Sequence, residues 1–145
     1  MIIYTDGGCS GNPGPGGWAF VVVENNEVIK KASGADKLTT NNKMELTAVI
    51  QALKYVIACG EKSCEIHTDS QYVKNGITAW IFNWKKKNWR TSGGDAVKNQ
   101  EYWMALDHIS AQLNVKWSWV KGHAGNEFNE LCDDLVKEQR EKNWT

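Results

Sequence analysis

The sequence predicts a single α/β domain over residues 1–145, built on a five-stranded mixed sheet with helices on both faces. Two short β-favouring stretches each end in Thr-Asp, at Asp6 and at Asp69. Strand-like segments 18–24 and 28–33 flank an Asn-Asn pair, which is a hairpin signal. Segments with helical periodicity separate the other strands, and this alternation is typical of a partly parallel sheet.

The first half of the chain is expected to contain three strands and a long helix. The glycine-rich segment 7–17 after the first strand predicts a tight loop that could approach a ligand closely, and a plain connection between strands is the alternative. Helix-capping residues at 39–42 precede the long helix, and Gly60 ends it. Its buried stripe is predicted to be Leu46, Val49, Ile50, Leu53 and Ile57.

The second half is expected to add a strand ending at Asp69, three helices, a strand and a last helix. We expect Ser70 to cap a helix ending near Gly76, and Thr78 to cap another through Trp84. A helix over 99–113, a strand over 115–120 and a loop over 122–126 follow. The last helix presents one apolar face, formed by Phe128, Leu131, Cys132, Leu135 and Val136.

The composition indicates a globular protein, with 41% hydrophobic and 23% charged residues. Its 17 basic and 17 acidic residues cancel, so net charge favours no class of partner. The longest apolar run, 18–23, is far short of the roughly 20 residues that span a bilayer, and no signal peptide is visible. The four cysteines form no C-x-x-C pair, which predicts reduced thiols. We therefore expect a cytoplasmic protein, a monomer with no membrane association and no obligate protein partner.

Acidic residues are the first candidates for a functional site. Right-handed crossovers would make the first, fourth and fifth strands parallel, so Asp6 and Asp69 would emerge at one edge of the sheet. Glu45 could join them from the long helix. The last helix could add a fourth acid, for which periodicity leaves three alternatives, namely Glu130, Asp133 and Asp134.

Four carboxylates in one crevice suit two divalent cations, about 3.5–4 Å apart, that act on a phosphoryl group. Oxygen ligands of this kind favour Mg²⁺ or Mn²⁺. The alternative for each acid taken singly is that it caps a helix or faces solvent. Because two Thr-Asp strand ends occur together, the sequence favours the metal site.

A basic and aromatic segment indicates the class of substrate. Between residues 80 and 90, cationic side chains alternate with aromatic ones, namely Lys85, Lys86, Lys87 and Arg90 with Trp80, Phe82, Trp84 and Trp89. Lysines can contact phosphates, and exposed indoles can stack on sugars or bases. The alternative is an amphipathic helix with a solvated charged face, but this pattern in a chain of zero net charge favours nucleic acid.

Several long motifs in the same order make the sequence similar to ribonuclease H of the bacterial type I class. They are residues 4–8 (YTDGG), 11–17 (GNPGPGG), 40–46 (TNNKMEL), 68–73 (TDSQYV), the basic segment, and 120–125 (VKGHAG) leading to Cys132-Asp133. The resemblance implies a ribonuclease H-like fold and an endonuclease that hydrolyses the RNA strand of RNA–DNA hybrids. It also implies two Mg²⁺ ions per active site, replaceable by Mn²⁺, and products with 5′-phosphate and 3′-hydroxyl ends.

The same resemblance assigns expected roles to single residues. Asp6, Glu45, Asp69 and Asp133 match the metal-binding catalytic acids, so the resemblance, and not the spacing, selects Asp133. His123 matches a loop histidine that assists proton transfer or product departure. The expected nucleic-acid contacts are Cys9, Asn12, Thr40, Asn41, Gln71, Trp80, Trp84, Lys85, Lys86 and Lys87.

Two other functions remain open from the sequence. One is a module that binds hybrids without cutting them, and the other is a DNA-directed nuclease or recombinase with the same fold. Clustered carboxylates argue against a pure binding module, because without metal they would repel phosphates. Cleavage of a hybrid compared with cleavage of duplex DNA would separate the remaining possibilities.

Overall fold

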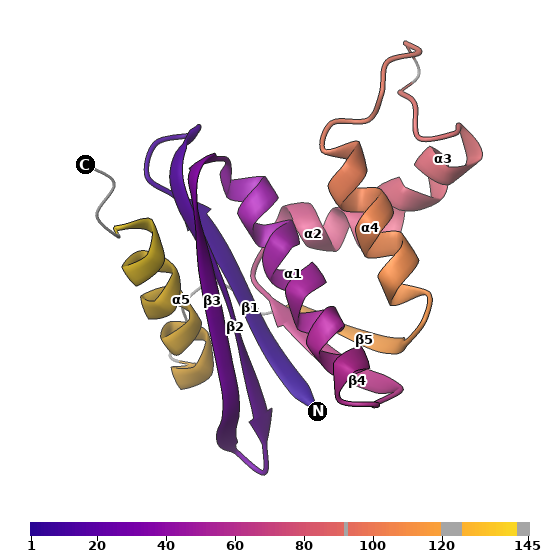
Figure 1. The fold of residues 1–145 in the computed structure, drawn as a ribbon. Coiled ribbons are helices and arrows are strands. Elements are labelled where there is room, and N and C mark those ends of the chain that lie inside the picture. Colours follow the sequence, from indigo (N-terminus) through magenta and orange to yellow (C-terminus); the bar gives the residue numbers. More distant parts are fainter. Residues whose placement is uncertain (92, 120–125, 142–145) are drawn as a thin grey trace.

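The computed structural model describes residues 1–91, 93–119 and 126–141, and it confirms the five-stranded mixed sheet with helices on both faces (Figure 1). The strand order in the sheet is β3-β2-β1-β4-β5. In chain order the elements are β1 (Ile2–Cys9), β2 (Gly14–Glu24), β3 (Glu27–Thr39), α1 (Asn41–Ala58), β4 (Ser63–Thr68), α2 (Gln71–Asn75), the π-helix η1 (Gly76–Trp80), α3 (Ile81–Lys86), α4 (Gln100–Ser110), β5 (Asn114–Trp119) and α5 (Glu127–Arg140).

The sheet topology brings the ends of β1 and β4 to the same edge. β1 pairs with β4 in parallel, and β4 pairs with β5 in parallel, whereas β1, β2 and β3 form antiparallel pairs. In Figure 1, α1 lies across one face of the sheet and α5 lies along the other, over the β1–β2–β3 side. Parallel strands with covered faces direct a ligand site to their carboxyl ends.

The main core lies between the sheet and α1, where β-strand side chains such as Ile3 and Ile66 meet Leu46, Val49 and Leu53. The predicted helical stripe is wrong at one position. Ile57 is 37% exposed, and Val56 is fully buried in its place. The reason is that the helical period of 3.6 residues carries the buried stripe three residues on from Leu53, not four.

The glycine-rich segment 7–17 is not a loop over most of its length. β1 continues to Cys9 and β2 begins at Gly14, so residues 10–13 alone connect the two strands. Gly8 and Gly17 are cross-strand partners, and a Cβ at Gly17 would lie 2.8 Å from the Val136 carbonyl oxygen. Glycine is therefore needed at position 17, because α5 lies directly against the sheet there and leaves no room for a side chain.

β3 is also longer than expected, since it runs to Thr39 rather than to Ser33. It keeps pairing with β2 as far as the Gly14–Thr39 pair. The Trp18 indole lies across Gly34, where a Cβ would come within 2.6 Å of the ring, so glycine again permits a close contact inside a strand.

The expected break at Gly76 is wrong, because α2, η1 and α3 form one continuous helical stretch over residues 71–86. A Cβ at Gly76 would overlap the ring of Trp103, which is fully buried. Thr78 caps no helix, and its hydroxyl donates to the Lys74 carbonyl oxygen at 2.8 Å. Packing against Trp103, and not helix termination, therefore explains the glycine at position 76.

All four cysteines are free thiols, as predicted. Among the helices of the described residues, none has the length and apolar character needed to cross a membrane.

Candidate active site

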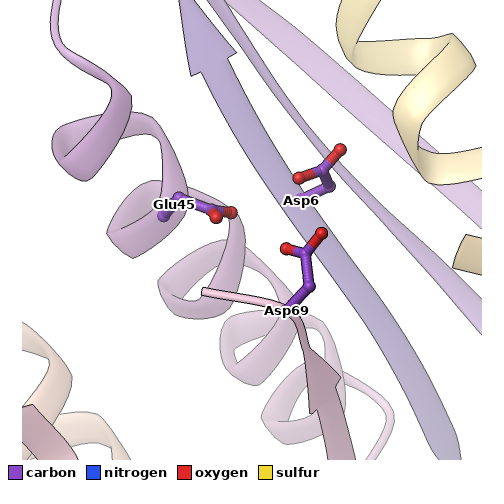
Figure 2. Close-up of side chains that lie close together, drawn as sticks. All are labelled: Asp6, Glu45 and Asp69. Atoms are coloured by element: carbon purple, nitrogen blue, oxygen red, sulfur yellow. The ribbon is translucent and has the colours of Figure 1, made fainter. Parts of the chain in front are cut away.

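Three carboxylates converge at the carboxyl end of β1 and β4. Asp6 lies in β1, Asp69 directly follows β4, and Glu45 lies near the start of α1. One oxygen from each of the three lies within 4.8 Å of the others, and Figure 2 shows all three side chains pointing into one space. The predicted meeting of Asp6, Asp69 and Glu45 is therefore present in the structure.

Local features of the chain place these acids. The parallel pairing of β1 with β4 sets Tyr4 opposite His67, so Asp6 and Asp69 both come two residues further along. Thr40 caps α1, because its hydroxyl accepts a hydrogen bond from the Lys43 amide at 3.2 Å. This cap fixes where α1 begins, and Glu45 consequently faces the sheet.

Burial and mutual repulsion disfavour the ionised forms of two of the three acids, Asp6 and Glu45. Burial, followed by the charges of Asp69 and Asp133, raises the pKa of Asp6 to about 7. Burial and the same acidic neighbourhood, with Asp6 the largest charge, raise the pKa of Glu45 well above its ordinary value. The Gly7 backbone amide hydrogen-bonds both carboxylates and partly offsets these shifts. A bound cation would favour the ionised forms of the same groups.

The structure also distinguishes the three acids of α5 that periodicity left open. Asp133 is half-buried, and its charge is close enough to Asp6 to raise the pKa of Asp6. Glu130 and Asp134 are exposed. The buried Cys132 thiol donates to the Tyr4 carbonyl oxygen at 3.2 Å, which docks this turn of α5 on β1. Asp133 lies outside the tight three-acid cluster of the described residues. Its Oδ2 forms an ion pair with Lys137 Nζ at 3.0 Å.

A polar cluster lies next to the acids, where β1 ends and α1 begins. The Cys9 amide donates to Asn41 Oδ1 at 2.7 Å, and the Asn41 amide donates to Asn12 Oδ1 at 3.3 Å. The structure thus brings together Cys9, Asn12 and Asn41, with Thr40 adjacent as the helix cap. Gln71 is exposed at the first position of α2. His123 lies outside the described residues.

Comparison with known proteins places this arrangement in a family. The RNase H family model matches residues 1–141. The chain belongs to the ribonuclease H family. A ribonuclease H of Treponema denticola is 52% identical to it, over 97% of this chain and 96% of the relative.

Solved structures of the ribonuclease H family share the fold. LC9-RNase H1, a type 1 RNase H with the type 2 active-site motif, has a TM-score of 0.82 at 29% identity, over 95% of this chain and 71% of that one. LC11-RNase H1, solved in complex with an RNA/DNA hybrid, has a TM-score of 0.72 at 26% identity, over 97% of this chain and 96% of that one.

The basic segment combines side chains that pack against the fold with side chains that are exposed. Trp84 is half-buried, with its ring centroid 5.4 Å from that of Trp103 and 5.8 Å from that of Trp80. Trp80 is 37% exposed, so part of its indole is accessible at the surface. Lys86 and Lys87 are exposed at the end of α3, whereas Lys85 Nζ lies 3.4 Å from Asp107 Oδ1. Figure 1 shows α3 set away from the sheet.

Sequence reasoning missed several residues that position the acids. The Trp119 indole donates to the Asp69 carbonyl oxygen at 3.3 Å, and Lys74 Nζ lies 4.5 Å from the centroid of the Trp119 ring. The Ser70 hydroxyl hydrogen-bonds the Glu45 carboxylate and also accepts from the Val73 amide at 3.2 Å. The position of Trp119 at the end of a strand parallel to β4 is the signal that could have found it, because such ends share one edge.

Proposed function

We propose that this chain is an endonuclease that hydrolyses the RNA strand of RNA–DNA hybrids with Mg²⁺. The observation that carries the proposal is the convergence of Asp6, Glu45 and Asp69 to within 4.8 Å at the carboxyl ends of two parallel strands. Membership of the ribonuclease H family supports the reaction class. A relative of known structure, LC11-RNase H1, was solved with an RNA/DNA hybrid, which supports the substrate class.

The residues of the cluster fit divalent cations. All the ligand atoms are carboxylate oxygens, which are the ligands that Mg²⁺ and Mn²⁺ prefer. Among the described residues, Glu45 Oε1 is buried and has no hydrogen-bond partner, so a cation would satisfy an atom that is otherwise costly to bury. We propose Asp6, Glu45, Asp69 and Asp133 as the ligands. When bound, two such ions would stabilise the attacking and leaving oxygens of the phosphodiester. We propose that the products carry 5′-phosphate and 3′-hydroxyl ends.

The chain itself contributes orientation and charge placement. The Trp119 indole holds the Asp69 backbone, and the Gly7 amide donates to the Asp6 and Glu45 carboxylates. Lys137 restrains the Asp133 carboxylate through the 3.0 Å ion pair. Preorganisation of this kind keeps the acids in one geometry through the reaction. We propose that His123 assists proton transfer or product departure from its glycine-flanked segment of sequence.

Two surfaces would hold the hybrid on either side of the reaction. The Cys9, Asn12 and Asn41 cluster offers amide and backbone groups next to the acids, and such groups can bind the 2′-hydroxyls of an RNA strand. The exposed Lys86 and Lys87 offer phosphate contacts for the DNA strand, and the partly exposed Trp80 of the same helical stretch offers a sugar contact. We propose Thr40, Gln71, Trp84 and Lys85 as further members of these surfaces. The four acids come from one chain, so the site needs no second copy, and we propose a monomer acting as a single domain. We also propose that it acts in the cytoplasm.

Cleavage of matched substrates tests the proposal. The wild-type protein in Mg²⁺ should cut the RNA strand of a labelled hybrid and leave duplex DNA of the same sequence intact. Its products should accept a kinase label only after phosphatase treatment, because their 5′ ends carry phosphate. Comparable cleavage of duplex DNA would instead indicate a DNA nuclease, and hybrid binding without cleavage in Mg²⁺ or Mn²⁺ would indicate a binding module.

Neighbouring acids supply matched variants. Asp69→Asn and Asp133→Asn should lose cleavage by 10²-fold or more, as expected for groups that act on the reacting atoms, while hybrid binding survives. Asp134→Asn removes the same charge from an exposed side chain one residue away and should keep wild-type turnover. Near-normal turnover of Asp69→Asn at saturating Mg²⁺ would disprove the assigned site.

A further inference from the structure

Arg140, the last residue of α5, reaches the edge of the acidic crevice from the C-terminal part of the chain. Its backbone nitrogen lies 3.2 Å from the point where a Cβ of Gly17 would stand, so the end of α5 packs on β2. Its guanidinium Nη1 lies 3.7 Å from the corresponding point at Gly8, the cross-strand partner of Gly17. The side chain therefore crosses from β2 to β1 through space that a side chain at position 8 would otherwise fill.

The alternation of β1 places this guanidinium beside the acids. Asp6 and Gly8 are two residues apart on one strand, so they face the same side of the sheet and are separated by about 7 Å. The Arg140 charge favours the ionised forms of the Asp6 carboxyl group and of the Cys9 thiol, because it lies close to both. Asn41 Oδ1 lies 3.6 Å from the position that a Cβ at Gly8 would take. Arg140 therefore also borders the polar cluster of Cys9, Asn12 and Asn41.

We propose that Arg140 contacts a phosphate of the RNA strand next to the scissile phosphate, between the acid cluster and the polar cluster. This inference rests on the proposed function, because the strand that passes over Asp6 is the one that is cut. A guanidinium presents a planar fork of N–H donors that matches phosphate geometry, and its charge would oppose the repulsion between the acids and the backbone.

A purely structural account of Arg140 predicts different behaviour. Cations in the last turn of a helix stabilise it by interacting with the helix dipole, and both Lys137 and Arg140 occupy that turn. In that account the loss of Arg140 would lower thermal stability and would leave the salt dependence of hybrid binding unchanged. Lys137 shows such a local arrangement, since it pairs with Asp133 four residues earlier in α5.

Binding measurements test the proposal without relying on turnover. In an Asp69→Asn background that does not cut, the Kd for a hybrid is measured against salt concentration for Arg140→Ala, Arg140→Gln and Arg140→Lys. Loss of one phosphate contact should weaken binding about tenfold and reduce the slope of log affinity against log salt by about 0.9 in the first two variants. Arg140→Lys should keep the slope and lose part of the affinity, because an ammonium lacks the fork.

The matched control is Lys54→Ala, which removes one positive charge from an exposed position of α1. Its slope should equal that of the parent protein. Arg140→Gln keeps most of the side-chain stem, so it separates loss of charge from loss of packing. An unchanged slope in a folded Arg140→Gln protein would overturn the proposal, whatever happens to its melting temperature.

Uncharged phosphate analogues show which strand of the hybrid Arg140 contacts. A methylphosphonate placed at single positions flanking the cleavage site of the RNA strand should weaken binding of the parent protein at one position and have no effect there on Arg140→Ala, as in a double-mutant cycle. The same coupling found only on the DNA strand would overturn the assignment. A parent protein that fails to prefer hybrid over duplex DNA would contradict the proposed function itself, whereas normal preference with unchanged Arg140 variants would contradict only this inference.

Discussion

Gly7 in β1 packs against the backbone of Glu45 in α1 so closely that a Cβ on residue 7 would lie 2.5 Å from the Glu45 nitrogen. The same added Cβ would also overlap the Met44 carbonyl carbon. Backbone atoms cannot move aside as a flexible side chain can. The spacing between Asp6 and Glu45, and thus the shape of the acid cluster, consequently depends on the absence of a side chain at position 7.

Gly7→Ala should therefore damage both stability and activity. Overpacking of this kind costs about 1–3 kcal/mol of unfolding free energy. Displacement of Glu45 by a fraction of an ångström up to about 1 Å can lower kcat by as much as 10²-fold. Urea unfolding and single-turnover cleavage of a hybrid measure the two effects. Gly93→Ala is the control, because the nearest atom to its added Cβ is 3.9 Å away; equal effects of the two substitutions would contradict the packing argument.

The raised pKa of Asp6 predicts how stability depends on pH in the absence of metal. Its folded-state pKa of about 7 exceeds the ordinary 3.8, so between these values the folded state binds more protons than the unfolded state. Rising pH then favours unfolding, and the stability present below pH 4 is progressively lost up to about pH 7. For Asp6 alone the loss is at most about 4 kcal/mol, since each pKa unit corresponds to about 1.4 kcal/mol.

Asp6→Asn removes this contribution together with the repulsion that the Asp6 charge exerts on Glu45, so both effects change stability in the same direction. In EDTA the variant should be more stable than wild type at pH 7, and the difference should vanish near pH 3. Added Mg²⁺ should stabilise the wild-type protein at pH 7 more than the variant, because the cation binds the folded state through the intact acids. Denaturant unfolding across pH measures the difference in unfolding free energy between wild type and variant. A wild-type protein that is more stable than the variant at pH 7 in EDTA would contradict the inference that burial and repulsion destabilise the Asp6 carboxylate.

Lys86→Ala combined with Lys87→Ala should raise KM far more than it lowers kcat. Contacts to phosphates away from the scissile bond stabilise the bound substrate and the transition state about equally, so their loss mainly raises KM. The slope of log affinity against log salt should fall by about 0.9 for each lost contact. Lys30→Ala with Lys31→Ala removes two exposed charges from β3 and should leave the slope unchanged. Equal slopes in all three proteins would show that the basic segment does not contact the backbone.

His123→Ala should slow cleavage without abolishing it. General acid–base assistance is typically worth 10²–10⁴-fold, and the profile of kcat against pH should lose a step near the imidazole pKa of about 6.5. If His123 instead only supports its segment, the variant should lose thermal stability and substrate affinity together, with an unchanged pH profile. Wild-type kcat across the whole pH range would refute a catalytic role.

Local pattern alone predicted much of the site. Two β-favouring stretches ending in Thr-Asp, with helical segments between later strands, were enough to place Asp6 and Asp69 at one edge of a parallel pair, which is the arrangement observed. The capping residues before α1 likewise placed Glu45 near the start of a helix that covers the sheet. These inferences succeed because alternation, helical period and capping depend on steric limits within a few neighbouring residues.

Contacts between distant segments decided the rest. The helical period treats Glu130, Asp133 and Asp134 alike until Cys132 docks on Tyr4, and only then is Asp133 the acid of α5 that faces Asp6. The sequence pattern predicts that a helix ends near Gly76, but Gly76 lies within a helical stretch and packs against Trp103. Arg140 and Trp119 reach the crevice from elements far from β1 in the chain. The physical reason is that close packing acts across elements, so which side chain fills a space depends on the surfaces that the completed fold brings together.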